Sequence, residues 1–338
     1  MRFILITTLL IVTVLVLIFL NLALGSSKIP LTEVLNAVLG LDTHKPIWQT
    51  IVLEFRLPRS ITACLAGSAL SISGLIMQTL FRNPLAGPGV LGVSSGAGLG
   101  VAVVLLGGLD VTTSMMNLFG SLSLAGAAFI GSFFILGIVI LISRKVKSAV
   151  SLLIIGLMMG YLSSALVNLL TYFSSAEQIR NYAIWSLGSF GDATWSNIQI
   201  LTMTGAISIF IAIFFSNRLD ILLLGENYAQ SMGLKVKQTR IGLILAASLS
   251  AGSVTAFCGP IAFLGLAVPH LSRRLLGNTK HIQLIPTAVF MGMAVALASD
   301  LLAKLPGSDQ TLPLNTITAL IGAPIVIGMV LKRQGWSY

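Results

Sequence analysis

The sequence predicts an all-α, polytopic membrane protein that crosses the bilayer about ten times. Only 9% of its 338 residues are charged, whereas soluble domains typically carry about 25%. Hydrophobic residues make up 56% of the chain, and its mean hydropathy is +0.98. Apolar runs of membrane-spanning length recur along the whole sequence, which excludes a soluble domain with a single anchor.

The apolar runs define the expected membrane helices. The run 3–24 follows Arg2 and is about 22 residues long, so it predicts an uncleaved first helix. A signal peptide would have a shorter apolar core and a small-residue cleavage site. The segment 260–276 is short and contains Pro269, which predicts a half-helix. The expected segments are, in order, 3–24, 57–81, 88–107, 115–142, 149–172, 195–215, 237–257, 260–276, 282–303 and 314–331.

The distribution of charge predicts the topology. If all the segments cross and the N-terminus is cytoplasmic, most of the 20 Lys and Arg residues fall in the cytoplasmic segments. Of the acidic residues, only Asp220 and Glu226 fall there. Cytoplasmic loops of membrane proteins carry an excess of Lys and Arg, so both termini are expected in the cytoplasm. The cations left on the outer side are Lys28, Lys45, Arg56, Arg59, Arg180 and Lys304.

The net charge of +10 does not indicate nucleic-acid binding, because no basic cluster is interleaved with aromatic residues. Cationic loops that face anionic membrane lipid explain it better. The two cysteines, Cys64 and Cys258, lie far apart in apolar surroundings. They predict neither a disulfide nor a metal site.

Stripes of glycine predict close helix packing. Gly92, Gly96 and Gly100 recur every four residues on one face of the third segment, where no loop is needed to explain them. Gly156 and Gly160 do the same on the fifth. Small residues at this spacing let helix backbones approach closely in lipid. We therefore expect residues 1–338 to form one transmembrane domain without a separate soluble domain.

The sequence contains no Walker motif G-x-x-x-x-G-K-[ST], so the chain is not expected to be an ATPase or any other enzyme. Ionisable residues at mid-membrane depth, typical of ion-coupled carriers, are also missing. Asp110, Asp192 and Asp300 lie near the ends of the predicted helices. An ion-coupled secondary transporter remains an alternative, since backbone oxygens also bind sodium.

The segment 92–96, GVSSG, matches the nucleophile-elbow pattern G-x-S-x-G of serine hydrolases. That pattern needs a strand–turn–helix context and a nearby base, but here it opens a membrane helix. His44, His270 and His281 are all expected near the membrane faces, away from Ser94. Helix packing is the simpler explanation, and an intramembrane hydrolase is the alternative.

Residues 221–240, ILLLGENYAQSMGLKVKQTR, form a polar stretch between two apolar segments. Within it, ENYAQSMGL predicts a short helix that ends at Gly233. A short amphipathic helix in a cytoplasmic loop is suited to docking into a groove on a partner protein. An ordinary loop whose charges set the topology is the alternative.

Five segments follow one another from about residue 50 to the end of the chain. They are RLPR (56–59), GSALSISGLIMQTLFRNPLAGPGVLGVSSGAGLG (67–100), LLGENYAQSMGL (223–234), GPIAFLGLAVPHLSR (259–273) and PLNTITALIGAP (313–324). Together these segments resemble the FecCD family, the permease subunits of ATP-driven importers for iron-siderophore, haem and cobalamin.

The resemblance implies the type II permease fold of ABC importers, in the cytoplasmic membrane of a bacterium. It implies a second permease copy or paralogue, two ATPase subunits that bind ATP and Mg²⁺, and an extracytoplasmic substrate-binding protein. This chain itself is expected to bind no cofactor or metal. The implied cargo is a metal chelate: a ferric siderophore first, then haem, then cobalamin.

The resemblance also implies roles for individual residues. Residues 216–236, the coupling loop, would contact the ATPases. Met232 departs from the family's usual leucine. The residues implied in this contact are Gly225, Glu226, Ala229, Met232, Gly233 and Leu234.

Two further sites follow from the resemblance. Arg56, Arg59 and Lys304 would bind acidic residues of the substrate-binding protein, although Lys304 replaces a family arginine. Snorkelling of the two arginines to the membrane interface is the alternative. Asn83 and Leu85 would form a cytoplasmic gate in the Asn-Pro-Leu-Ala turn, and a plain connecting turn is the alternative.

Overall fold

The computed structural model of the chain describes residues 2–25, 27–107, 121–143, 146, 149–304 and 311–331. Every regular element in these ranges is helical. The elements are α1 (Arg2–Ala23), α2 (Leu31–Val38), α3 (Pro46–Thr50), the π-helix η1 (Ile51–Arg56), α4 (Leu57–Leu80), the 3₁₀ helix η2 (Pro88–Leu91), α5 (Val93–Leu106), α7 (Ser121–Ser143), α8 (Ala149–Tyr172), α9 (Ala176–Ser186), α10 (Trp195–Phe214), α11 (Ser216–Leu223), α12 (Glu226–Ser231), α13 (Val236–Cys258), α14 (Leu264–Leu276), α15 (His281–Ala303) and α16 (Leu314–Leu331).

The predicted all-helical membrane fold is confirmed. Within the described ranges, seven helices are long and apolar enough to span a membrane, and α5 and α16 are shorter apolar helices. The half-helix expected at 260–276 is α14, which has 13 residues. Several charged residues used in the topology argument lie outside the described residues: Asp110, Arg144, Lys145, Lys147, Lys332 and Arg333.

Two helix boundaries differ from the prediction. The segment expected at 88–107 becomes helical only at Val93, because η2 and a left-handed Gly92 (φ +75°) come first. The helical segment expected to begin at residue 57 begins earlier, because α3 and η1 continue without a break into α4. Pro58 is tolerated there because it lies in the first turn of α4, where its missing N–H is not needed.

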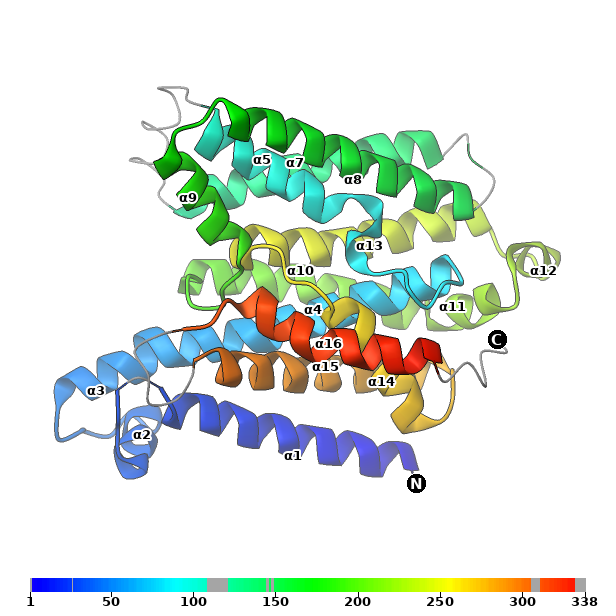
Figure 1. The fold of residues 1–338 in the computed structure, drawn as a ribbon. Helices are drawn as coiled ribbons and strands as arrows, with labels where there is room; N and C mark the ends of the chain where they lie inside the picture. The colour runs from blue at the N-terminus through cyan, green and yellow to red at the C-terminus, as the bar shows by residue number, and fades with distance from the viewer. Residues whose placement is uncertain are drawn as a thin grey trace.

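The helices form a bundle around α4 and α13 (Figure 1). In the most apolar window of each span, 83% of the residues are buried for α4 and 78% for α13. The corresponding share is only 17% for α1 and for α8. α4 packs against α10, α13, α14 and α15. The exposed side chains of α1 and α8 are mostly large and apolar, as expected for helices that face lipid or another subunit.

The two ends of the bundle carry different short elements. α12 projects at one end, where α1 begins and α16 ends, and α2, α3 and α9 lie at the opposite end (Figure 1). We call these the α12 end and the α9 end. The prediction that the chain begins and ends its crossings on the same side agrees with this arrangement.

The glycine stripe of the third segment packs α5 against α7. A Cβ atom on Gly96 would lie 2.6 Å from the carbonyl oxygen of Gly131, and one on Gly100 would lie 2.0 Å from that of Ala127. Neither distance is possible, so only glycine permits this close approach. Gly92 is different from the prediction, since it caps α5 in a left-handed conformation that does require a loop glycine.

Candidate functional site

The coupling loop folds as two short helices, α11 and α12, joined at Gly225. The backbone of Gly225 has φ +109° and ψ 152°, a conformation that residues with a side chain rarely adopt. α12 spans only Glu226–Ser231. It ends where the Leu234 N–H donates to the Ala229 carbonyl at 3.0 Å, around Gly233 at φ +82°. This confirms the short helix that was expected to end at Gly233.

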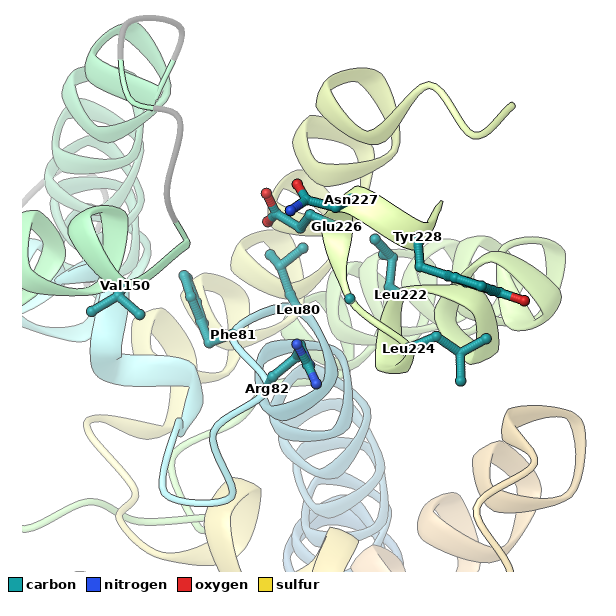
Figure 2. Close-up of a pocket in the computed structure, with 10 residues that line it drawn as sticks. Leu80, Phe81, Arg82, Val150, Leu222, Leu224, Glu226, Asn227 and Tyr228 are labelled. Atoms are coloured by element: carbon teal, nitrogen blue, oxygen red, sulfur yellow. The ribbon is translucent and has the colours of Figure 1, made fainter. Parts of the chain in front are cut away.

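α12 has a buried side and an exposed side. Ala229 is fully buried and packs in the same core cluster as Leu219 and Leu222 of α11. The large apolar side chains of Leu224, Tyr228 and Met232 are 57%, 55% and 56% exposed. Tyr228 on α12 and Met232 at its C-terminal cap lie one helical turn apart, whereas Leu224 ends α11 just before the non-helical Gly225. Figure 2 shows Leu224 and Tyr228 projecting from the loop.

The predicted contact residues divide into buried and exposed ones. Gly225 and Ala229 are buried, and Leu234 is half-buried against the core, so they position α12 instead of forming its outer surface. Met232 is exposed as the prediction requires. Leu224 and Tyr228, which are not in the predicted set, are also exposed.

Glu226 connects α12 to the long helix α13. Its carboxylate accepts a hydrogen bond from the guanidinium of Arg240 and forms an ion pair with it. The Arg240 side chain is 6% exposed and that of Glu226 25%. The Nε atom of Arg240 has no hydrogen-bond partner within the described residues. Glu226 is therefore the counter-ion of a buried cation, and this ties α12 to a helix that runs through the centre of the bundle.

A cleft of about 640 Å³ opens beside α12. It lies between the coupling loop, the end of α4 and the start of α8 (Figure 2). Arg82, exposed and at the unusual φ of +46°, lines the cleft together with Glu226. A Cβ on Gly225 would lie 3.3 Å from the Arg82 guanidinium, so the loop and the end of α4 are in contact here.

The predicted gate turn directly follows Arg82. The Asn83 side chain accepts a hydrogen bond from the Leu85 N–H at 2.9 Å, which closes the turn. Leu85 is 47% exposed. The Pro84 carbonyl oxygen lies 2.7 Å from His270 Nε2, so α14 holds the turn. The structure thus brings the predicted gate and the coupling loop to the same end of the bundle, with Arg82 between them.

The α4–α14 contact is reinforced by Gln78. Its amide donates to the Leu266 carbonyl at 3.0 Å and accepts from Arg273 at 2.6 Å. This network gives the Pro-His-x-x-Arg motif of α14 a structural role, and His270 bonds a backbone oxygen instead of facing a cofactor.

A second connection holds α11 and was missed by sequence reasoning. Asp220 accepts a hydrogen bond from the His281 N–H at 3.0 Å, and its carboxylate lies 2.6 Å from His281 Nδ1. His281 Nε2 lies 2.8 Å from the Thr79 hydroxyl of α4. Burial alone would raise the pKa of Asp220. Its hydrogen bonds to His281 and the charges of His281 and Lys280 have the larger, opposite effect, so the pKa of Asp220 lies below its ordinary value.

Two of the three predicted docking cations, Arg59 and Lys304, contact Asp300 at the α9 end, and Asp300 is fully buried. The Arg59 Nε donates to Asp300 at 2.8 Å, and Lys304 Nζ lies 2.9 Å from the other carboxylate oxygen. Lys304 also donates to the Asn21 side chain at 2.9 Å. The Lys304 side chain is 8% exposed and that of Arg59 23%.

Arg56 differs from the exposed cation that the prediction describes. It is 7% exposed, and its guanidinium donates to the carbonyl oxygens of Leu22, Ala23 and Ser27 at 2.7, 3.0 and 2.6 Å. The carbonyls of Leu22 and Ala23 are among those that the end of α1 leaves without helical partners, and that of Ser27 belongs to the segment that follows. In this structure Arg56 therefore fastens α1, and only Arg59 of the three cations has substantial access to the surface.

The serine-hydrolase pattern at 92–96 has no base beside it. The Ser94 hydroxyl lies 3.4 Å from the Thr255 hydroxyl. The histidines are engaged elsewhere, His44 with Glu33, His270 with Pro84 and His281 with Asp220. Within the described chain, nothing activates Ser94 as a nucleophile.

Relatives and solved structures agree on the family. The FecCD transport family profile matches residues 12–332. A hemin transport system permease protein of Yersinia pestis is 35% identical over 93% of this chain and 92% of that protein. A vitamin B12 import system permease protein of Klebsiella pneumoniae is 34% identical over 97% of this chain and 93% of that protein.

The fold has a close structural counterpart. A metal-chelate type ABC transporter solved in an inward-facing conformation superimposes with a TM-score of 0.84 at 30% identity. The match covers 97% of this chain and 99% of that one. A complex of PsaBC from Streptococcus pneumoniae, at 17% identity and a TM-score of 0.52, shares the fold alone. The helical bundle, its coupling loop and these matches together show that the chain belongs to the FecCD transport family.

Proposed function

We propose that this chain is the membrane permease subunit of an ATP-binding-cassette importer and moves a metal chelate by alternating access. The single observation that supports this most is the build of α12. An exposed apolar surface, made by Leu224 before the helix, Tyr228 on it and Met232 at its end, is held on the core by the pair of Glu226 and the buried Arg240. Such a helix suits the transfer of force from a separate ATPase to the bundle.

The proposed transmission runs through two contacts. Movement of α12 is passed to α13 through the Glu226–Arg240 pair, and to the end of α4 through the contact of Gly225 with Arg82. The turn with Asn83 and Leu85 follows Arg82, so it lies in position to act as the cytoplasmic gate. ATP binding must favour one conformation over the other, because only differential binding shifts such an equilibrium.

The cargo is proposed from the family. Relatives are named for hemin and for vitamin B12, and the structural counterpart is of the metal-chelate type. We favour a ferric siderophore, then haem, then cobalamin. The chain itself would hold no cofactor, and ATP with Mg²⁺ would bind the partner ATPases.

The remaining partners occupy different surfaces. Two ATPase subunits would bind the α12 end, and an extracytoplasmic binding protein would dock at the α9 end, where Arg59 reaches the surface. A second permease copy or paralogue would cover part of the exposed apolar surface of helices such as α8. The α12 end would face the cytoplasm of a bacterium, with both termini there.

The experiment that tests this function is uptake of a ⁵⁵Fe-labelled chelate into right-side-out vesicles that contain the complete complex, with inside-out vesicles as the control that should show no uptake. We expect uptake to require ATP on the α12 side and to survive a protonophore and the removal of sodium. Uptake that follows an ion gradient without ATP would instead support a secondary transporter.

A further inference from the structure

A second pocket, of about 270 Å³, lies apart from the coupling loop, between α5, α8 and α9. α8 supplies Ser164 and Asn168, which lie in its half nearest Tyr172 and therefore toward the α9 end. Ser94 and Ser95 come from the start of α5, and Tyr182 and Trp185 from α9. We call this the hydroxyl-lined pocket.

The polar groups of the hydroxyl-lined pocket are available to a ligand. The side chains of Ser95, Ser164, Asn168 and Tyr182 make no hydrogen bond to any other residue that the structure describes, and they are not sealed from the pocket. A Cβ atom at position 98 would lie only 3.3 Å from the Tyr182 hydroxyl, so Gly98 leaves room for that hydroxyl. The ring of Trp185 lies 5.9 Å from that of Tyr182 and adds an apolar surface.

The hydroxyl-lined pocket carries no formal charge. None of the described residues that line it is Asp, Glu, Lys, Arg or His. An anion that leaves water for such a place loses its hydration and finds no counter-ion, which is costly at membrane depth. An uncharged ligand with oxygen and N–H groups on its surface loses far less, because hydroxyl and amide partners replace its water.

The pocket is also incomplete. Sites that enclose a ligand usually measure about 300–1,000 Å³, so one of 270 Å³ contacts a chelate on one side only. On the same side of α8 as Ser164 and Asn168, Leu157 and Tyr161 are 43% and 65% exposed. A second subunit against that face would supply the opposite wall.

We propose that the hydroxyl-lined pocket is one half of a cargo site and selects an electrically neutral metal chelate with a hydrogen-bonding periphery, such as a ferric trihydroxamate, over anionic chelates. This inference rests on the proposed function and narrows it to a class of cargo. Asn168 is the residue expected to contribute most, because its amide both donates and accepts hydrogen bonds.

The test measures equilibrium binding to the complex of permease and ATPase subunits in nanodiscs, without the substrate-binding protein, which would itself bind the chelate. The probes are a neutral ⁵⁵Fe-trihydroxamate, an anionic ⁵⁵Fe-tricatecholate and haem, which carries two propionates. We expect the wild type to bind the trihydroxamate most tightly. Asn168→Ala should weaken that binding about fivefold to tenfold, as the loss of one hydrogen bond to a desolvated group does.

Two further variants separate charge from shape. Asn168→Lys should weaken trihydroxamate binding and strengthen tricatecholate binding, because it adds a cation to an uncharged pocket. Ser164→Ala, one turn away, should weaken trihydroxamate binding by a smaller factor. Asn181→Ala is the matched control, since Asn181 is exposed on α9 but does not line the pocket, and it should leave all three affinities unchanged.

The inference is overturned if the wild type binds the tricatecholate or haem at least as tightly as the trihydroxamate, if it binds none of the probes, or if Asn168→Ala matches Asn181→Ala. The proposed function is scored separately in the same samples, by retention of the ATPase and by ATP-driven uptake of any chelate. A complex that retains its ATPase and takes up an anionic chelate would keep the proposed function and reject the neutral-cargo site.

Discussion

Glu226 at the start of α12 is the counter-ion of Arg240, which lies buried in the first turns of α13. The two residues are 14 positions apart and belong to different helices. One helix end that projects from the bundle is thereby fixed to a helix that runs through its centre. The pair therefore connects α12 directly to α13.

Loss of this counter-ion should weaken the protein and its coupling together. Glu226→Ala leaves a buried guanidinium without a partner, so we expect the free energy of unfolding to fall by about 1–3 kcal/mol. ATP-driven uptake should fall more than ATPase activity, since α12 no longer moves α13. Thermal unfolding and the ratio of transport to hydrolysis measure the two effects. Asn227→Ala is the control, because Asn227 is exposed beside Glu226.

The backbone at Gly225 should not accept a side chain. Its φ of +109° is strained for any L-residue, and a Cβ there would lie 3.3 Å from the Arg82 guanidinium. Gly225→Ala should therefore cost about 1–3 kcal/mol of unfolding free energy. Gly233, at φ +82°, has nothing within 4 Å of an added Cβ, so Gly233→Asn should be tolerated and Gly233→Val should not. Equal melting temperatures for wild type and Gly225→Ala would refute the strain argument.

The buried and exposed sides of α12 should respond differently to substitution. Ala229 is fully buried, so Ala229→Leu must displace Leu219 or Leu222 and should cost about 1–3 kcal/mol. Met232 is 56% exposed, so Met232→Ser should leave the melting temperature of the isolated subunit unchanged. A Met232→Ser subunit that unfolds as readily as Ala229→Leu would show that Met232 is part of the core.

Substitution of Arg56 and of Arg59 at the α9 end should affect different properties, stability in the first case and binding-protein affinity in the second. Arg56→Ala removes the partner of two carbonyl oxygens at the end of α1 and of the Ser27 carbonyl beyond it, so it should lower stability by about 1–3 kcal/mol. Arg59→Ala leaves Asp300 with Lys304 and should chiefly weaken binding-protein affinity, by at least about tenfold. Lys28→Ala, an exposed cation at the same end, is the control. Unchanged affinity in Arg59→Ala would remove Arg59 from the docking surface.

Asp220 should contribute stability that is lost in acid. The pKa of Asp220 is lowered below its ordinary 3.8 in the folded protein, so its stabilisation is complete above that value and disappears as the pH falls through the lower folded pKa. Asp220→Asn lacks this contribution. The difference in melting temperature between wild type and Asp220→Asn should therefore shrink as the pH is lowered from about 6 to about 3. A difference that stays constant over this range would exclude the linkage.

The sequence predicts the helices better than the side-chain contacts. Membrane helices are long and apolar, so hydropathy locates them, and Gly96 and Gly100 pack as their spacing predicts. Motifs also located the coupling loop. They did not separate residues that contact a partner from residues such as Ala229 that hold the loop in place, because that distinction depends on which side of α12 meets the core.

Long-range polar contacts explain the other differences. Arg56 looked like a surface cation, but the chain brings it to the open end of α1, 34 residues earlier in the sequence. The contact of Asp220 with His281 joins residues 61 positions apart. Neither pairing has a local signature, since both depend on how the helices are arranged in the bundle.

The central claim is that the exposed row of Leu224, Tyr228 and Met232 is the surface that binds a separate ATPase. The most direct measurement is copurification from the native membrane in mild detergent, with the retained proteins identified by mass spectrometry. We expect a protein with a Walker motif to be retained by the wild type and lost from a subunit with all three residues changed to serine, while that subunit keeps the wild-type melting temperature. Equal retention of the ATPase by both subunits, or no ATPase with the wild type even after mild crosslinking, would contradict the claim.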